Sequence, residues 1–396
     1  MSNETEHNSA PIRCDITTAQ PAVAVGRRMV IGGAAVTLGL TAGLAVRSSA
    51  VLASSRGSAV LPPELAAPPI CRAAAATGAL PAPAGPARHV RFAYNGTGIC
   101  TVAVPVALHR GYFERHNLDV EFVQLAGSTD QMLQALATDK ADAGVSMLLN
   151  WLKPLEQGFD VKLTTGLHGG CTRLLVRRDA GITDITQLRR RTIGVSNLSG
   201  TPRNFVAILL SDNGINPDTE VNWREYPADI LGLALQRDEI QALADSDPSV
   251  WLTRLRGKGD LVEIASNLSG AYANLTCCTL GVRGALLRDD RATVAALTLA
   301  IREAAVHVHT DPDDAAQVFS PYTPKVPVTE LAAMLRTHTH GHNPAGEALR
   351  QEVVKITGDL KRASVIKPGT DPVKLANRVV EDGLLNPEDT QRIISE

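Results

Sequence analysis

Apolar and polar residues alternate in short runs over most of the chain beyond residue 88. The run HVRFAYNG, residues 89–96, alternates and ends at Gly96, which predicts a strand followed by a loop. The run LDVEFVQL, residues 118–125, predicts a second strand by the same pattern. Between them, residues 102–113 predict a helix that stops at Gly111. This part of the chain therefore opens with a strand, a helix and another strand.

The same succession continues along the chain. Residues 126–144 predict a helix, because Met132, Leu133, Leu136 and Ala137 recur at helical spacing. Further strands are predicted at 161–178 (one or two, joined at Gly169-Gly170), 191–197 and 220–226, and mostly helix over the last hundred residues. Strands that alternate with helices of about 10–15 residues predict an α/β protein with mainly parallel sheets and crossover helices.

The first 50 residues have the layout of an export signal. Arg27-Arg28 precede the uncharged run 29–46, and Ser48-Ser49-Ala50 offer small residues for cleavage. The arginine pair indicates the twin-arginine route, which carries folded proteins. An uncleaved transmembrane anchor is the alternative, but the run is at the lower length limit and rich in glycine. We therefore expect a mature protein that begins between about residues 48 and 60.

Residues 51–88 differ in composition from the remainder of the chain. They are rich in alanine and proline and have no periodic apolar face, which predicts an extended spacer. Cys71 follows isoleucine, a poor fit to a lipid-attachment site, so we do not expect a lipid anchor there.

Composition narrows the function classes for the remaining 300 or so residues, enough for one large or two medium domains. The whole chain has 39 Lys+Arg against 41 Asp+Glu, without the basic excess of a nucleic-acid-binding protein. Aromatic residues make up only 4%, which argues against a stacking surface for bases or sugars. Six cysteines permit disulfides in an exported protein but specify none.

Small polar residues are predicted where strands end and helices begin. These are the loop at 95–100, the helix start at Ser128-Thr129, and the helix start at 199–201. In open α/β sheets the ligand binds at the carboxyl ends of the strands, where helix starts present backbone N–H groups. Hydroxyl side chains beside such groups suit an oxyanion such as carboxylate, sulfonate or nitrate. Ordinary helix capping explains any one of these positions equally well, so the functional interpretation requires them to converge.

Residues 111–146, GYFERHNLDVEFVQLAGSTDQMLQALATDKADAGVS, resemble the first lobe of periplasmic binding proteins of the nitrate/sulfonate/taurine transporter type. Similar motifs occur in LEQGFDVKLTTG, residues 155–166, and in ITDITQLRRRTIGVSNLSGT, residues 182–201. In the latter, Arg191 stands where the family more often has glycine or lysine. The resemblance extends over roughly residues 89–385, the size of a domain pair.

The resemblance implies a two-lobe, type II periplasmic binding fold. Lobe 1 would comprise 89–171 and 278–396, lobe 2 would comprise 172–277, and hinge strands would cross near Gly170-Cys171 and Thr276–Cys278. The protein would be a periplasmic monomer that carries a small solute to an ABC transporter permease, with no catalytic residue, metal or cofactor. The ligand contacts carried over by the resemblance are Asn95, Thr97, Ser128, Thr129, Met147, Asn150, Gly200 and Thr201, and we add His168 because it directly precedes the first hinge. One departure concerns residues 237–259, which lack the family's glycine before Asp238, so ligand contacts from this segment are doubtful.

An enzyme on the same fold is the alternative function: a thiamine-pyrimidine synthase or a chorismate dehydratase-like enzyme. The synthase is iron-dependent and carries a longer cysteine-rich run than the pair Cys277-Cys278, for which we favour buried, apolar packing in a strand. If the hinge strands run side by side, Cys171 comes within bonding reach of one member of the pair. Free thiols remain the favoured state, because disulfide geometry is demanding.

Other polar clusters have structural explanations that we prefer. His338, His340 and His342 alternate as in a metal site, but Gly341 and Pro344 predict a loose surface loop. Arg173 and Arg203 can pair with an anionic ligand, although a surface position is expected for each. His307 and His309 fall near a predicted helix end, where cations favour the helix dipole.

Overall fold

The computed structural model describes residues 85–96, 98–125 and 129–386, and for Thr129 and Asp130 it describes the backbone alone. The predicted export signal and most of the predicted spacer lie outside these residues. In the part of the chain that is described, no helix combines the length and the apolar character needed to cross a membrane.

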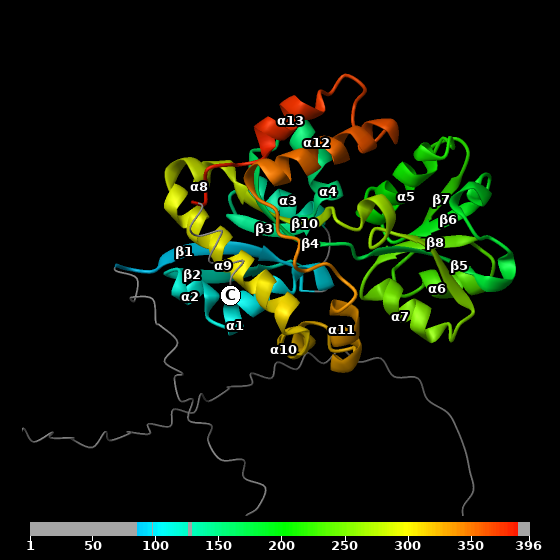
Figure 1. Cartoon of the computed structure of the whole chain (residues 1–396), viewed down its shortest axis with the longest axis horizontal. Helices are drawn as coiled ribbons and strands as arrows, with labels where there is room; N and C mark the ends of the chain where they lie inside the picture. Colours follow the sequence, from blue (N-terminus) through cyan, green and yellow to red (C-terminus); the bar gives the residue numbers. More distant parts are fainter. Residues whose placement is uncertain (1–84, 97, 126–128, 387–396) are drawn as a thin grey trace, which may run out of the picture. The chain divides into compact units, whose positions relative to one another are not determined.

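Ten strands among the described residues form two sheets (Figure 1). The first sheet has the order β2-β1-β3-β10-β4, with β1 (Arg88–Tyr94), β2 (Leu118–Gln124), β3 (Ala143–Met147), β4 (Val161–Gly169) and β10 (Thr276–Arg283). The second sheet has the order β7-β6-β8-β5-β9, with β5 (Thr172–Arg177), β6 (Thr192–Val195), β7 (Asn222–Glu225), β8 (Ala242–Ser246) and β9 (Leu261–Ser266). The chain passes from the first sheet to the second between β4 and β5, and returns between β9 and β10.

Helices cover both faces of each sheet (Figure 1). Around the first sheet these are α1 (Ala103–His109), α2 (Tyr112–Arg115), α3 (Thr129–Ala137), α4 (Leu148–Glu156), α8 (Gly284–Asp289) and α9 (Arg291–Thr310). The C-terminal helices are α10 (Pro312–Phe319), α11 (Val328–Leu335), α12 (Gly346–Arg362) and α13 (Pro372–Val379). Around the second sheet, α5 (Thr201–Asp212) covers one face, and α6 (Leu231–Gln236) and α7 (Ser249–Arg256) cover the other.

The predicted two-lobe α/β class is confirmed, with one correction to the sheets. Each sheet is mixed rather than mainly parallel. In the first, β1 pairs in parallel with β2 and β3, whereas β10 pairs antiparallel with β3 and β4. In the second, β5 likewise runs antiparallel to β8 and β9. The reason is that β5 and β10 enter their sheets from the opposite sheet rather than through a crossover helix, so the right-handed parallel connection does not apply to them.

The first sheet packs closely against α4 at a glycine. Trp151 of α4 is fully buried and lies over Gly281 of β10. A Cβ atom at Gly281 would fall 2.6 Å from two ring carbons of Trp151, so no larger residue fits there without displacing the ring.

A buried carboxylate joins three strands of the first sheet. Asp142, just before β3, accepts hydrogen bonds from Arg91 of β1 through the backbone N–H (2.9 Å) and the guanidinium (2.8 and 3.0 Å), and from Arg283 of β10 at 2.8 Å. Burial alone would raise the pKa of Asp142, but these hydrogen bonds outweigh it and lower the pKa to about 2. The Asp of the Asp-Ala-Gly motif therefore has a structural role.

We expect Asp142→Asn to lower the free energy of unfolding by about 1–2 kcal/mol at pH 7. Because the pKa of Asp142 is lower in the folded state than its ordinary value, this stabilisation is present above pH 4 or so and is lost as the pH falls toward about 2. Denaturant unfolding at pH 7 and at low pH measures both effects. Asp119→Asn is the control, since its side chain is 69% exposed and pairs only with His89 at 3.1 Å in the described residues. An equal loss in both variants would show that the three-strand contact is not stabilising.

Candidate functional site

The start of α5 is open to a ligand. Gly200 is the N-cap residue, and no side chain of the described residues caps the helix. Pro202 occupies the first turn, where its missing N–H costs nothing. The capping explanation for Ser199 and Thr201 is therefore wrong at this helix. Backbone N–H groups and the positive end of the helix dipole remain available for an anion.

Thr201 connects the start of α5 to α4. Its side chain is buried, and its hydroxyl donates a hydrogen bond to Asn150 Oδ1 at 2.8 Å. Asn150 belongs to α4, which follows β3 of the first sheet, so two residues expected at the ligand site are in direct contact across the two sheets. Ser246, at the end of β8, also contacts Met147 Sδ at 3.6 Å. The segment 237–259, from which contacts were doubtful, thus reaches the same region.

A cavity of about 290 Å³ lies between α4 and the start of α5. Its positive charges are Lys153 and Arg203. Lys153 pairs with Glu156 at 3.2 Å, and Arg203 pairs with Asp218 at 2.6 Å and lies over the Trp223 ring. The remaining lining residues are Leu133, Leu149, Asn150, Pro154, Asn197, Leu198, Ser199, Gly200, Asn204 and Val365. The cavity is therefore polar and large enough for a small solute, and each of its two cations is paired with a carboxylate.

A second, narrow cavity of about 40 Å³ lies at the carboxyl ends of β1 and β3. Asn95, Cys100, Thr101, Ser146 and Met147 line it together with apolar neighbours. The side-chain oxygen of Asn95 is buried there and has no hydrogen-bond partner among the described residues. The structure thus brings Asn95 and Met147 to one cavity, and Asn150 and Gly200 to the neighbouring one. Thr97 and Ser128 lie outside the described residues, and of Thr129 only its position at the start of α3 is described.

His168 lines neither cavity and lies inside a buried group of histidines and cysteines. It is 1% exposed, and its ring centroid lies 5.7 Å from that of His338 and 5.0 Å from that of His340. The prediction of a loose surface loop for these histidines is wrong, since His338 and His340 are 6% and 2% exposed. The cause is backbone pairing: Gly169 and Thr339 exchange two hydrogen bonds, at 3.1 and 3.3 Å, which fix the loop against β4.

The cysteine pair of β10 is buried, as predicted. Cys277 and Cys278 are 6% and 0% exposed. All four described cysteines are free thiols. Cys277 is the member of the pair that contacts Cys171, with 3.5 Å between the sulfur atoms.

Arg173 forms a buried ion-pair network, so the expectation of a surface arginine is wrong. It is 4% exposed, and its guanidinium donates to Asp247 at 3.0 and 3.1 Å and to Glu263 at 2.9 Å. Asp247 also accepts from His338 at 2.8 Å. Because these carboxylates already neutralise Arg173, it is not free to pair with a ligand. The sequence alone does not reveal this network, because the partners of Arg173 are far from it in sequence. An arginine within the buried strand TRLLVR nevertheless indicates that a buried partner is needed.

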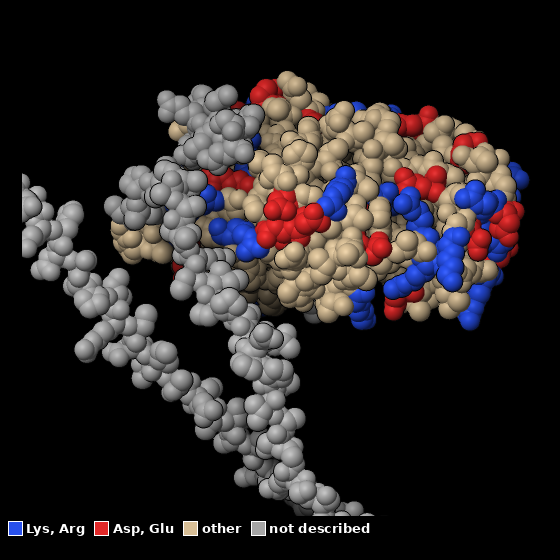
Figure 2. Space-filling view, turned by 60° about the horizontal axis from the view of Figure 1, so that its bottom comes forward, with Lys and Arg blue, Asp and Glu red and all other residues tan. Residues whose placement is uncertain are grey.

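On the face shown in Figure 2, acidic and basic side chains of the described residues are interspersed. That face offers no broad basic surface of the kind that binds nucleic acid. This distribution agrees with the balanced charge of the whole chain.

Solved structures define the class of fold. The periplasmic aliphatic sulphonate-binding protein SsuA of Escherichia coli superposes with a TM-score of 0.63 at 13% identity, over 76% of this chain and 94% of that one. The periplasmic nitrate-binding protein NrtA of Synechocystis PCC 6803 gives 0.63 at 12% identity, over 77% and 89%. The protein therefore has the type II periplasmic binding protein fold.

The family is established by the sequence. A family model described as NMT1/THI5 like matches residues 101–315, more than half of the chain, so the chain belongs to the NMT1/THI5-like family. The resemblance inferred from its motifs is thereby confirmed. A Haemophilus influenzae protein whose name assigns it provisionally to thiamine biosynthesis is 24% identical over 241 residues, covering 58% of this chain and 73% of that protein.

We expect Arg173→Met to lower the free energy of unfolding by about 3–5 kcal/mol, because it leaves Asp247 buried without its cation. Arg177→Met, in the same strand, is the matched control: Arg177 pairs with exposed Asp179, and its loss should cost no more than about 1 kcal/mol. Adding Asp247→Asn to Arg173→Met should recover part of the loss. Chemical denaturation of the variants measures these differences, and equal losses at Arg173 and Arg177 would refute the buried network.

Proposed function

We propose that this protein is the extracytoplasmic solute-binding component of an ABC importer. It would capture a small anionic or polar solute, such as nitrate, a sulfonate or a carboxylate, and deliver it to a membrane permease. The observation that carries this proposal is the uncapped start of α5, which opens beside a cavity of about 290 Å³ that also holds Lys153 and Arg203. Helix starts with neighbouring cations are general anion-binding features.

The proposed ligand contacts come from both sheets. On the first sheet's side, Asn95 follows β1, Met147 ends β3 and Asn150 lies in α4. On the second sheet's side, Gly200 and Thr201 stand at the start of α5. Thr97, Ser128 and Thr129 remain part of the proposal by family resemblance. His168 is omitted from the solute contacts, because it lies in the buried group of cysteines and histidines. Contact between Thr201 and Asn150 supports a site that closes when the two sheets approach each other.

Export through the twin-arginine route, with a cleaved signal and a periplasmic, monomeric product, belongs to the same proposal. The arginine pair before an uncharged run supports it. N-terminal sequencing of the secreted protein tests the cleavage, and a soluble cytoplasmic product that retains Met1 would exclude export.

A second candidate is an enzyme related to thiamine-pyrimidine synthesis. The name of the Haemophilus influenzae relative and the buried group of cysteines and histidines favour it. The two functions differ in the fate of the small molecule. Mass spectrometry of the compound retained by the purified protein, before and after prolonged incubation, separates them, because a binding protein returns its ligand unchanged and an enzyme converts it.

We expect Thr201→Val to weaken binding of the retained solute about tenfold, because the variant keeps its shape but loses the hydroxyl that bonds Asn150 of α4 at the helix start. Arg203→Gln should weaken it further for an anionic solute, and increasingly so at low salt. Titration calorimetry gives the affinities. Thr219→Val is the control, because Thr219 is exposed and lies in the loop between α5 and β7. Unchanged affinity in both test variants, with thermal stability preserved, would contradict the proposed site.

A further inference from the structure

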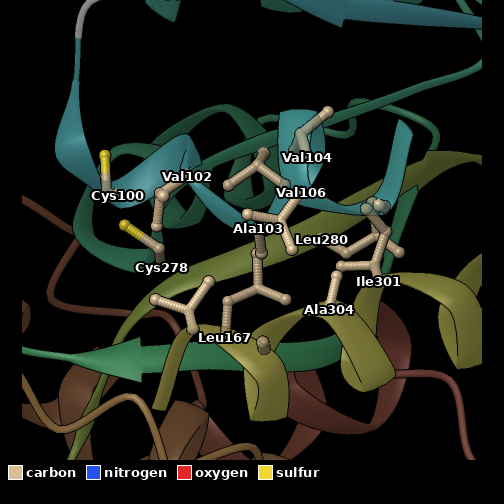
Figure 3. Packing of buried hydrophobic residues seen from close by; sticks show 14 of the residues in the cluster. Cys100, Val102, Ala103, Val104, Val106, Leu167, Cys278, Leu280, Ile301 and Ala304 are labelled. Atoms are coloured by element: carbon tan, nitrogen blue, oxygen red, sulfur yellow. The ribbon is translucent and has the colours of Figure 1, made fainter. Parts of the chain in front are cut away.

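Sulfur and imidazole groups from distant parts of the chain meet at one buried point of the first sheet. Cys100 follows β1, His168 lies in β4, and Cys278 lies in β10. The ligand atoms of these three side chains all lie within 4.8 Å of one another. Figure 3 shows Cys100 and Cys278 as near neighbours within the apolar core around Val102 and Leu167.

Burial of these groups is close to complete. Cys278 and His168 are 0% and 1% exposed, and Cys100 is 9% exposed at the edge of the narrow cavity. Two thiols and one imidazole from separate elements are the donor types that thiophilic metal ions prefer. Packing of small apolar residues accounts for buried thiols, but it does not account for a polar imidazole held among them.

The hydrogen bonding of His168 leaves one ring nitrogen unused. Nδ1 lies 3.2 Å from the carbonyl oxygen of Gly169, which suits an N–H donor. Nε2 is buried and has no hydrogen-bond partner among the described residues. When Nδ1 carries the proton in this arrangement, Nε2 keeps a lone pair that can bind a ligand. Metal-binding histidines characteristically donate their other N–H to a backbone carbonyl in this way.

The neighbouring histidines form a surrounding layer. His338 stacks against His168 and is held by Asp247, which in turn pairs with Arg173. This arrangement fixes the His168 ring from one side, and the bond to Gly169 fixes its Nδ1 edge. A rigid imidazole is a requirement of a selective metal site.

Charge balance selects the kind of ion. Two thiolates neutralise a divalent cation, and neutral His168 adds no charge, so the occupied site carries no net charge in the apolar core. A third thiolate would leave an uncompensated negative charge. We propose that Cys100, Cys278 and His168 bind a thiophilic divalent ion of the zinc type, through two thiolates and Nε2. The proposed ligands do not include Cys171 and Cys277, whose sulfur atoms contact each other at 3.5 Å.

The proposal of this metal site does not rest on the proposed transport function, but the location of the site has one consequence for it. A zinc ion with three protein ligands keeps a fourth position. Cys100 also lines the narrow cavity with Asn95 and Met147, so the ion would lie beside the polar end of that cavity.

The test is a titration of the reduced full-length protein with Zn²⁺ in competition with a chromophoric chelator. We expect one ion per chain, and cobalt substitution should give the intense absorption of thiolate-to-cobalt charge transfer. Thiol ligands lose their protons when they bind a metal ion. Binding should therefore release about two protons per ion, measured by calorimetry in buffers of different ionisation enthalpy.

Cys278→Ser and His168→Gln should each weaken Zn²⁺ binding at least tenfold and reduce or remove the charge-transfer absorption. His342→Gln is the matched control, because its Nε2 lies 2.7 Å from Glu352 Oε1 in the same C-terminal loop as His340. Cys71→Ser controls for a cysteine remote in sequence from the three ligands. Circular dichroism separates loss of folding from loss of the site.

Three results would overturn the proposal: no binding by the folded, reduced protein, binding without proton release, or equal weakening by His342→Gln and His168→Gln. Retention of the charge-transfer absorption at full strength in folded Cys278→Ser would overturn it as well.

Discussion

One side-chain amide fixes the passage between the two sheets. Asn267, just after β9, accepts hydrogen bonds through its Oδ1 atom from the backbone N–H groups of Cys171 (2.9 Å) and Thr172 (2.8 Å). Its own backbone N–H donates to the Thr172 carbonyl at 3.1 Å. These bonds hold the connection from β4 to β5 beside the connection from β9 to β10. They also supply hydrogen-bond partners for buried backbone groups that are not paired within either sheet.

Glycine is required at the same point. Gly170 has a φ of +64°, and a Cβ atom there would lie 2.4 Å from Leu268. At Gly169 a Cβ would lie 2.3 Å from the Thr339 hydroxyl. The close approach of these segments positions both features that matter for function: the meeting of α4 with α5, and the convergence of His168 with the thiols of β10.

The sequence pattern predicts most elements, because alternation and helix spacing are local properties. The strands at 88–94, 118–124 and 192–195 and the stop at Gly111 all follow from it. The antiparallel position of β10 does not, because it depends on where the chain returns after about a hundred residues in the second sheet. The sequence pattern also fails to predict that the loop with His338 and His340 is buried, for a related reason. Glycine and proline indicate a loop, but only backbone pairing with β4 decides that the loop is buried.

Polar side chains are harder to place from the sequence than the backbone that carries them. Ser199 and Thr201 do lie at a helix start, yet the cap is Gly200, which leaves the hydroxyl of Thr201 to bond Asn150 instead. Arg173 is neutralised by carboxylates 74 and 90 residues away in sequence, and the thiols of Cys100 and Cys278 approach each other only because β1 and β10 flank β3. A buried polar group is defined by its partners, and partners from distant strands are fixed by topology rather than by local pattern.

The proposed metal site and the proposed solute site meet at the narrow cavity of the first sheet, and this proximity has a thermodynamic consequence. Cys100 belongs to the thiol–imidazole group and also lines the cavity that holds Asn95. An ion bound there replaces two buried thiol protons by a divalent charge beside that cavity, and so changes the field that a solute experiences. If solute and ion affect each other's affinity, they must do so by the same factor, because coupling free energy is reciprocal. A solute affinity that depends on zinc would therefore indicate that both ligands bind beside the narrow cavity. A solute affinity that does not depend on zinc would indicate that the ion has only a structural role in the first sheet.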